Sequence, residues 1–201
     1  DRAFSRYLKL RARDLITNDY ESGDAAWVTS RFGRLNAQIG AYETYDDELY
    51  GVKAAHSMSI LLTDSVRTAQ VRNAIQGLQG LENSLPYDRH KKVIENIPIG
   101  VYDIIADFGQ ARGVNTASIL PNDNDLTRRY GRIILMRRNI LLNPDLVAAG
   151  RRSVEVTVEP RHHKDFDPEG GFQRTLWHEI GHYLGPDQTR DGRPLDQALE
   201  S

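Results

Sequence analysis

The ten residues from Trp177 to Pro186, WHEIGHYLGP, constrain this chain more than any other stretch. They contain the pattern His-Glu-x-x-His, in which His178 and His182 are four residues apart. On a helix, residues at this spacing lie one turn apart on the same face, so both imidazoles can bind one metal ion. Glu179 projects beside them, where its carboxylate can accept a proton from the attacking water of a hydrolysis. The sequence therefore predicts a zinc-binding helix with His178 and His182 as metal ligands.

The apolar residues around this motif also favour a helix. At about 100° per residue, one apolar stripe contains Phe172, Leu176, Ile180 and Leu184, and the two histidines point away from it. A helix that packs on a core by one face and carries paired imidazoles on the other has the form that a metal site requires. The alternative is that two surface histidines flank a glutamate by chance, and the specificity of the motif favours the metal site.

The composition is that of a globular protein. The chain has 201 residues, enough for one core or for one domain and part of another, and 39% of them are hydrophobic. A net charge of −2 provides no basic field for nucleic acid. No apolar run has the length that spans a bilayer, and there is no cysteine for disulfides, iron–sulfur clusters or a cysteine nucleophile. Neither the compartment, cytoplasmic or exported, nor the oligomeric state follows from these features.

Several helices are expected before the motif. Apolar residues at near-helical spacing indicate an amphipathic helix over residues 2–16, and Asp24 is expected to cap a short helix. A long helical stretch is expected over about 51–80. The sequence Asn-Pro-Asp at 143–145 predicts a turn into another short helix.

Five segments are expected to be strands, because they have apolar runs or a period of two between glycine, proline and asparagine. They are 39–45, 101–108, 116–120, 132–136 and 154–158. The predicted fold class is therefore α+β, with a small mixed or antiparallel sheet or partial barrel packed with helices and the His-Glu-x-x-His helix near the C-terminus. The sequence shows no repeating βαβ pattern and no glycine-rich phosphate loop.

The motif supplies two metal ligands, whereas a catalytic zinc normally has three protein ligands and an open position for water. In metzincins the motif continues as His-Glu-x-x-His-x-x-Gly-x-x-His; here the glycine matches, but the last position is Gln188, a poor zinc ligand, with Asp187 one residue out of register. In gluzincins a later glutamate completes the site, and Glu200 is near that distance. His162 and His163 are adjacent, so their side chains diverge, and a solvated loop is expected for them. The residues alone leave the third ligand open.

Three stretches together resemble dipeptidyl peptidase III, the M49 family of metallopeptidases. Residues 39–55, IGAYETYDDELYGVKAA, are similar to a family block that reads roughly I-G-P-x-E-x-Y-x-D followed by F-G. Residues 113–123 end in Leu-Pro-Asn-Asp, similar to a family segment that ends in P-N after a strand. Residues 178–186 resemble the bacterial five-residue form of the family's zinc motif, followed by the same L-G-P. The blocks agree in order and rough spacing, so the resemblance spans about residues 24–186.

The resemblance implies a zinc-dependent exopeptidase of the dipeptidyl peptidase III type that acts on oligopeptides. His178 and His182 match the family's zinc ligands, and Glu179 matches its general base. The implied cofactor is therefore Zn²⁺, and the implied partner is a peptide substrate. From the net charge and the apolar runs, no nucleic acid and no membrane span are expected.

The same resemblance implies roles in substrate binding. Tyr45 matches a tyrosine that stabilises the oxyanion, a role that a phenol fills by donating a hydrogen bond. Glu43 matches a carboxylate that holds the amino terminus of the peptide, and Asn122 matches an asparagine that binds substrate backbone. Two positions depart from the family: Ile119 stands where a second substrate asparagine is expected, and a family glutamate falls near Ser57. Both departures weaken the polar recognition of a dipeptide amino terminus.

The resemblance also implies two lobes, one containing β-structure and one helical and zinc-binding, with substrate between them. We therefore expect residues 1–160 to form a mixed α/β lobe with the substrate-binding segments, and residues 161–201 to begin an incomplete helical lobe. The chain begins at Asp1 rather than at methionine, and the family's third zinc ligand, a later glutamate, would lie beyond Ser201. The alternatives are a zincin of another class and a truncated domain that binds peptide or metal without turnover.

Overall fold

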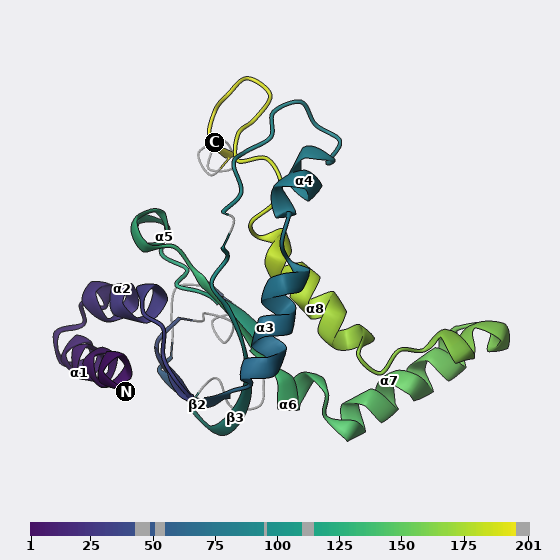
Figure 1. Ribbon diagram of the computed structural model, residues 1–201, viewed down its shortest axis with the longest axis horizontal. Helices are drawn as coiled ribbons and strands as arrows, with labels where there is room; N and C mark the ends of the chain where they lie inside the picture. Colours follow the sequence, from purple (N-terminus) through teal and green to yellow (C-terminus); the bar gives the residue numbers. More distant parts are fainter. Residues whose placement is uncertain (43–48, 51–54, 95, 110–114, 196–201) are drawn as a thin grey trace.

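The computed structural model describes residues 1–42, 49–50, 55–94, 96–109 and 115–195. Within these residues the chain forms a curled five-stranded sheet with helices packed on both sides (Figure 1). The strands are β1 (Leu35–Gly40), β2 (Ser57–Thr63), β3 (Ile99–Gly109), β4 (Ala117–Leu120) and β5 (Ile133–Arg137). The predicted α+β class, with a mixed sheet, is confirmed.

The strands follow the order β1-β2-β3-β5-β4. Only β3 and β5 pair in parallel; the other three pairs of neighbours are antiparallel. Arg137 on β5 donates from Nη2 to Gln38 Oε1 on β1 at 2.6 Å and from Nη1 to Ser118 Oγ on β4 at 2.9 Å. Because β1 lies three places from β5 in the sheet order, these bonds require strong curvature. The sheet is therefore a half-barrel, with β1 and β4 as the edges of the described sheet.

Helices connect and cover the strands. They are α1 (Arg2–Thr17), α2 (Glu21–Thr29), α3 (Ser65–Ala74), α4 (Leu78–Asn83), α5 (Asn124–Tyr130), α6 (Arg138–Leu141), α7 (Pro144–Thr157) and α8 (Gly170–Gly181), with a 3₁₀ segment at Pro160–Asp165. Helix α7 projects from the body, and none of its residues is buried (Figure 1). In the part of the chain that the structure describes, no helix is long and apolar enough to cross a membrane.

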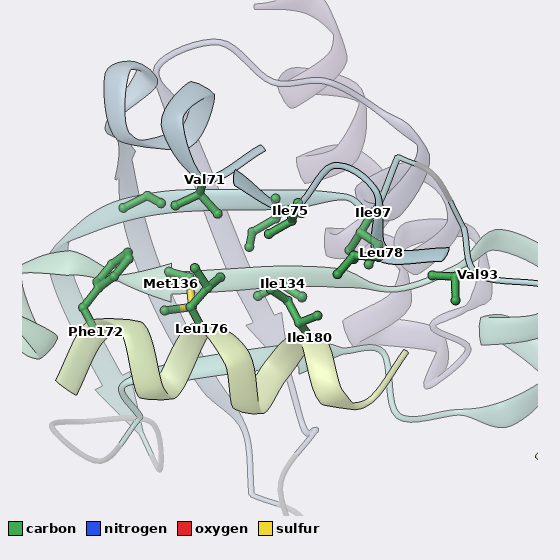
Figure 2. Close-up of a cluster of buried hydrophobic side chains, with 12 residues drawn as sticks. Val71, Ile75, Leu78, Val93, Ile97, Ile134, Met136, Phe172, Leu176 and Ile180 are labelled. Carbon is green, nitrogen blue, oxygen red and sulfur yellow. The ribbon is translucent and has the colours of Figure 1, made fainter. Parts of the chain in front are cut away.

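Two apolar clusters lie on opposite faces of the sheet. One contains Ile134 and Met136 of β5 together with side chains of α3 and α8 (Figure 2). The other contains Leu135 of β5 together with Tyr7 of α1 and Trp27 of α2. Adjacent residues of a strand point to opposite faces, so one strand serves both cores. Full burial of each large apolar side chain contributes about 1.5–3 kcal/mol.

The strand predicted at 154–158 is wrong, because these residues form the end of α7. Asn143 caps this helix, since its Oδ1 accepts a hydrogen bond from the N–H of Asp145 at 2.9 Å, and Pro144 occupies the first turn. Val154 and Val158 are four residues apart, so the same valines that alternate along a strand also fit one face of a helix. The Asn143 cap and Pro144 favour a helix that begins here, and the valines fit its period.

The long helix predicted over 51–80 is also wrong. Residues 57–63 form β2, whose backbone pairs with β1 on one side and with β3 on the other, so they belong to the sheet and not to a helix. Helix α3 begins only after Asp64, whose Oδ1 accepts from the N–H of Arg67 at 2.9 Å. The strand predicted at 39–45 ends earlier, since β1 ends at Gly40, and residues 43–45 lie outside the described part.

Candidate metal and peptide site

Helix α8 brings His178 and His182 together. His178 lies in the last turn, and His182 is the C-cap residue with helical φ and ψ of −64° and −15°. Their ring centroids are 5.2 Å apart, and the two ring planes lie at 89°. Both side chains are exposed to solvent. Two imidazoles at this separation can turn their nitrogens toward one cation.

The apolar stripe predicted for this helix holds it on the sheet. Phe172, Leu176 and Ile180 are 1%, 3% and 0% exposed, and Leu184 packs against the same cluster. Figure 2 shows the first three pointing from α8 toward the strands. The helix therefore buries one face, and the two histidines lie on the part that remains exposed.

Glu179 differs from the histidines that flank it, since its side chain is only 7% exposed. Successive helical residues point about 100° apart, so Glu179 lies between the apolar stripe and the exposed histidines. Among the described residues, no group of three or more His, Cys, Asp and Glu side chains is placed to hold a metal ion. Two imidazole nitrogens nevertheless fit zinc by ligand type, and they could provide two of the protein ligands that a zinc site needs.

The surroundings of His182 favour a neutral imidazole. Partial burial lowers the pKa of His182 below its ordinary value, and electrostatic interactions with His178 and Arg132 lower it further. A neutral imidazole is the form that binds metal ions. The next residue, Tyr183, donates from its hydroxyl to the carbonyl of Arg132 at 3.1 Å, and this contact ties the end of α8 to the start of β5.

Glu82 fixes the chain that follows the histidines, a contact that the sequence did not predict. Its Oε2 accepts from the N–H of Gly185 at 2.9 Å, and Gly185 has a φ of +91° that favours glycine. Its Oε1 accepts from the Tyr87 hydroxyl and from the N–H of Lys91. Burial alone would raise the pKa of Glu82, but these hydrogen bonds lower it overall. No local pattern predicts the contact of Glu82 with Gly185, because the two residues are 103 positions apart in the sequence.

Strand β4 lies beside α8. Ala117 and Ile119 pack against the apolar cluster that contains the α8 stripe, and β4 is an edge strand of the described sheet. Asn122 follows this strand, is exposed, and donates from Nδ2 to the carbonyl of Tyr42 at 3.3 Å. The structure thus places the motif helix next to an edge strand that leads to Asn122.

Two predicted site residues, Glu43 and Tyr45, lie outside the described residues. Ser57, near the position of a family glutamate, is buried at 8% exposure.

The other proposed ligands have separate surroundings. His162 and His163 lie in the 3₁₀ segment, where His162 Nδ1 is 3.0 Å from Asp165 Oδ2 and His163 Nε2 is 2.8 Å from the carbonyl of Val158. Gln188 forms an isolated β-bridge with Pro194. Asp187 is exposed, and Glu200 lies outside the described part of the chain.

The curled sheet with the motif helix beside its edge strand has the fold of dipeptidyl peptidase III. Dipeptidyl peptidase III from Caldithrix abyssi superimposes with a TM-score of 0.80 at 28% identity, covering 92% of this chain and 36% of that chain. The dipeptidyl-peptidase III from Corallococcus sp. strain EGB gives 0.79 at 29% identity, with coverages of 93% and 35%. The resemblance predicted from the sequence is therefore confirmed at the level of fold.

Sequence comparison finds a further relative. Nudix hydrolase 3 of Arabidopsis thaliana is 29% identical over 188 residues, which are 92% of this chain and 24% of that protein. No family model matches the sequence. The chain thus spans about a third of the length of the two solved structures and about a quarter of the plant protein. These proteins are all hydrolases by name.

Proposed function

We propose that this chain carries the catalytic motif of a zinc-dependent peptide hydrolase of the dipeptidyl peptidase III type, acting on oligopeptides. The observation that carries the proposal is the exposed imidazole pair of α8 beside edge strand β4, which leads to Asn122. The likeness to two dipeptidyl peptidase III structures supports it. The division into a lobe of residues 1–160 and the start of a second lobe at 161–201 remains a prediction.

An edge strand next to a catalytic helix suits an extended peptide as substrate. Edge strands carry backbone groups that can pair with an added strand, and many proteins bind peptides in this way. A peptide paired with β4 would run beside α8, because Ala117 and Ile119 of β4 pack against the same cluster as the α8 stripe. The Asn122 amide, one residue beyond Pro121, would then donate to and accept from the peptide backbone.

The residues of the motif would divide the chemistry among them. His178 and His182 would hold the metal through ring nitrogens. Zinc, when bound, supplies a Lewis acid for the scissile carbonyl and makes water more acidic. Glu179 would accept a proton from the attacking water and pass it to the leaving amine.

Substrate recognition would come from residues that the resemblance identifies. Tyr45 would donate a hydrogen bond from its phenol to the oxyanion, and Glu43 would form an ion pair with the amino terminus of the peptide. The half-buried Ile119 and the buried Ser57 provide no carboxylate or amide at the two departing positions. Weaker selection for a free amino terminus is therefore expected, and longer peptides should be accepted.

Metal analysis and peptide assays test this proposal. The purified protein is incubated with Zn²⁺ and offered dipeptidyl arylamides, longer oligopeptides and, as a second arm, a substrate of a Nudix hydrolase. The Glu179→Gln variant should keep its zinc and lose about 100-fold or more of the peptidase rate, whereas Gln173→Ala, on the exposed face of the same helix, should match the parent.

Three outcomes would contradict the proposal. Peptidase activity of Glu179→Gln within a few-fold of the parent would point to another base and another class of zincin. Peptide or metal binding without turnover would favour a non-catalytic binding domain. Turnover of the Nudix substrate alone would assign the hydrolase activity to a different chemistry.

A further inference from the structure

Tyr42 connects two parts of the molecule that are distant in sequence. Its hydroxyl accepts a hydrogen bond from Arg11 Nη2 at 2.8 Å and donates one to Asp24 Oδ1 at 2.6 Å. Its carbonyl accepts from Asn122 Nδ2 at 3.3 Å. Its ring stacks on Trp27 with the centroids 6.0 Å apart. Tyr42 is therefore held by α1 and α2 through its side chain and touches Asn122 through its backbone.

Arg11 is the centre of the cluster that holds Tyr42. Its side chain is 1% exposed, and its guanidinium lies 5.5, 5.1 and 5.8 Å from the ring centroids of Tyr7, Tyr20 and Tyr42. It donates a short hydrogen bond to Asp24 of α2. Removing one partner of a buried ion pair leaves an uncompensated charge, so the loss of Arg11 or Asp24 should be destabilising. Asp24 thus lies within α2 and binds Arg11, and its predicted role as a helix cap is wrong.

Gly23 and Asp14 show how closely this cluster is packed. Asp14 is fully buried, and its Oδ2 lies 3.4 Å from Arg11 Nη1. A Cβ at Gly23 would lie 1.9 Å from that carboxylate oxygen and 3.2 Å from Arg11 Cζ. The absence of a side chain at Gly23 therefore lets both charged groups take their places.

The phenol of Tyr42 remains a donor at neutral pH. Burial raises the pKa of Tyr42 well above its ordinary value, although the charge of Arg11 opposes the shift. Its hydroxyl can therefore bond to Arg11 and to Asp24 at once over the whole physiological range.

We propose that Arg11, Asp24 and Tyr42 are positioning residues for peptide recognition: through the Tyr42 carbonyl they set the place of Asn122. This inference rests on the proposed function, in which Asn122 binds the backbone of the substrate. The three residues do not touch the peptide. They lower the cost of binding by holding Asn122 where the peptide needs it, so that less freedom is lost on association.

The Tyr42→Phe variant tests the positioning directly, because it keeps the ring on Trp27 and removes only the hydroxyl. We expect the NMR resonances of the Asn122 side-chain amide to move toward those of a free asparagine. The matched control is Tyr102→Phe, which loses a buried hydroxyl in the same apolar cluster, one that accepts from Asn36 Nδ2 at 3.1 Å. That control should leave the Asn122 resonances in place.

Two variants of Arg11 provide a rescue test. Arg11→Met removes the charge and should move the Asn122 resonances further than Tyr42→Phe does. Arg11→Lys restores a charge and should return them part of the way. If Arg11→Met does not fold, the comparison of Tyr42→Phe with Tyr102→Phe still decides the question.

Peptide affinity tests the functional consequence. A tetrapeptide should bind about fivefold more weakly to Tyr42→Phe, the effect expected when the one hydrogen bond between Asn122 and the peptide is lost. Asn122→Ala should weaken binding by a similar factor. The double variant should bind no more weakly than Asn122→Ala alone, because Tyr42 acts through Asn122. The zinc affinity should stay unchanged in all three.

The outcomes separate this inference from the proposed function. Unmoved Asn122 resonances in Tyr42→Phe would overturn the inference, whatever the peptide does, and so would additive losses in the double variant. Resonances that move in a protein that binds no peptide would confirm that the cluster positions Asn122 and would reject the proposed function.

Discussion

The two halves of the candidate site are held in different ways. The helix with His178 and His182 rests on an apolar stripe, whereas Asn122 is connected through Tyr42 to the buried charges of Arg11 and Asp24. Apolar packing tolerates substitutions that conserve volume, but a buried charge cluster does not tolerate the loss of one partner. The half with the two histidines should therefore be sensitive to cavities, and the half with Asn122 to single lost charges.

The largest effect is expected from a cavity under α8, the helix that carries the two histidines. Phe172→Ala removes a side chain that is 1% exposed, so the free energy of unfolding should fall by about 3–5 kcal/mol. Phe172→Leu keeps most of the volume and should cost less than half as much. Urea unfolding measures both, with Gln173→Ala on the exposed face as control. Equal losses for Ala and Leu would show that packing does not hold this half.

A somewhat smaller effect is expected from removing the buried charge. Arg11→Met leaves the carboxylates of Asp14 and Asp24 buried without their cation and should lower the free energy of unfolding by about 3 kcal/mol. Arg2→Met, at an exposed position of the same helix, is the control and should stay within about 0.5 kcal/mol of the parent. If Arg11→Met is as stable as the parent, the buried charges do not hold the half with Asn122, and both halves of the site depend on apolar packing.

The smallest of these effects concerns Glu82 and depends on pH. Because the pKa of Glu82 is lower in the folded state, its contribution to stability is present above the ordinary glutamate value of 4.5 and is lost as the pH falls through the folded value. Glu82→Gln should therefore cost about 1–3 kcal/mol at pH 7 and less at pH 3. Urea unfolding at both pH values checks this, with the exposed Glu155→Gln as control. If Glu82→Gln lowers the free energy of unfolding equally at both pH values, the charge of Glu82 does not contribute to stability.

Elements with strong local signals were predicted from the sequence. The helix of residues 2–17, the strands of residues 99–109, 117–120 and 133–137, and the motif helix lie where periodicity and breakers place them. Strand β2 was missed because its pairing with β1 and β3 outweighs a pattern that also fits a helix. The valines at the end of α7 satisfy both periods, so alternation alone could not decide between them.

In the site, too, local contacts could be predicted from the sequence and contacts between distant residues could not. The spacing of His178 and His182 predicts their proximity, because the helix itself sets it. The contact of Tyr42 with Asn122 joins residues 80 apart, and that of Glu82 with Gly185 joins residues 103 apart, so no local pattern contains them. The buried charge cluster, however, left one signal in the sequence. Arg11 lies four residues after Tyr7 on the apolar face of the first helix, and a charged residue on a buried face implies buried partners.

The Zn²⁺ affinity of the protein tests whether His178 and His182 form a metal site. Competition with a chromophoric chelator at neutral pH gives this affinity for the parent, for His178→Ala and His182→Ala, and for the control His162→Ala. Each motif variant should bind Zn²⁺ at least about tenfold more weakly than the parent, since each loses one of two imidazole ligands, and the control should be unchanged. Equal affinity in all four proteins would contradict the claim.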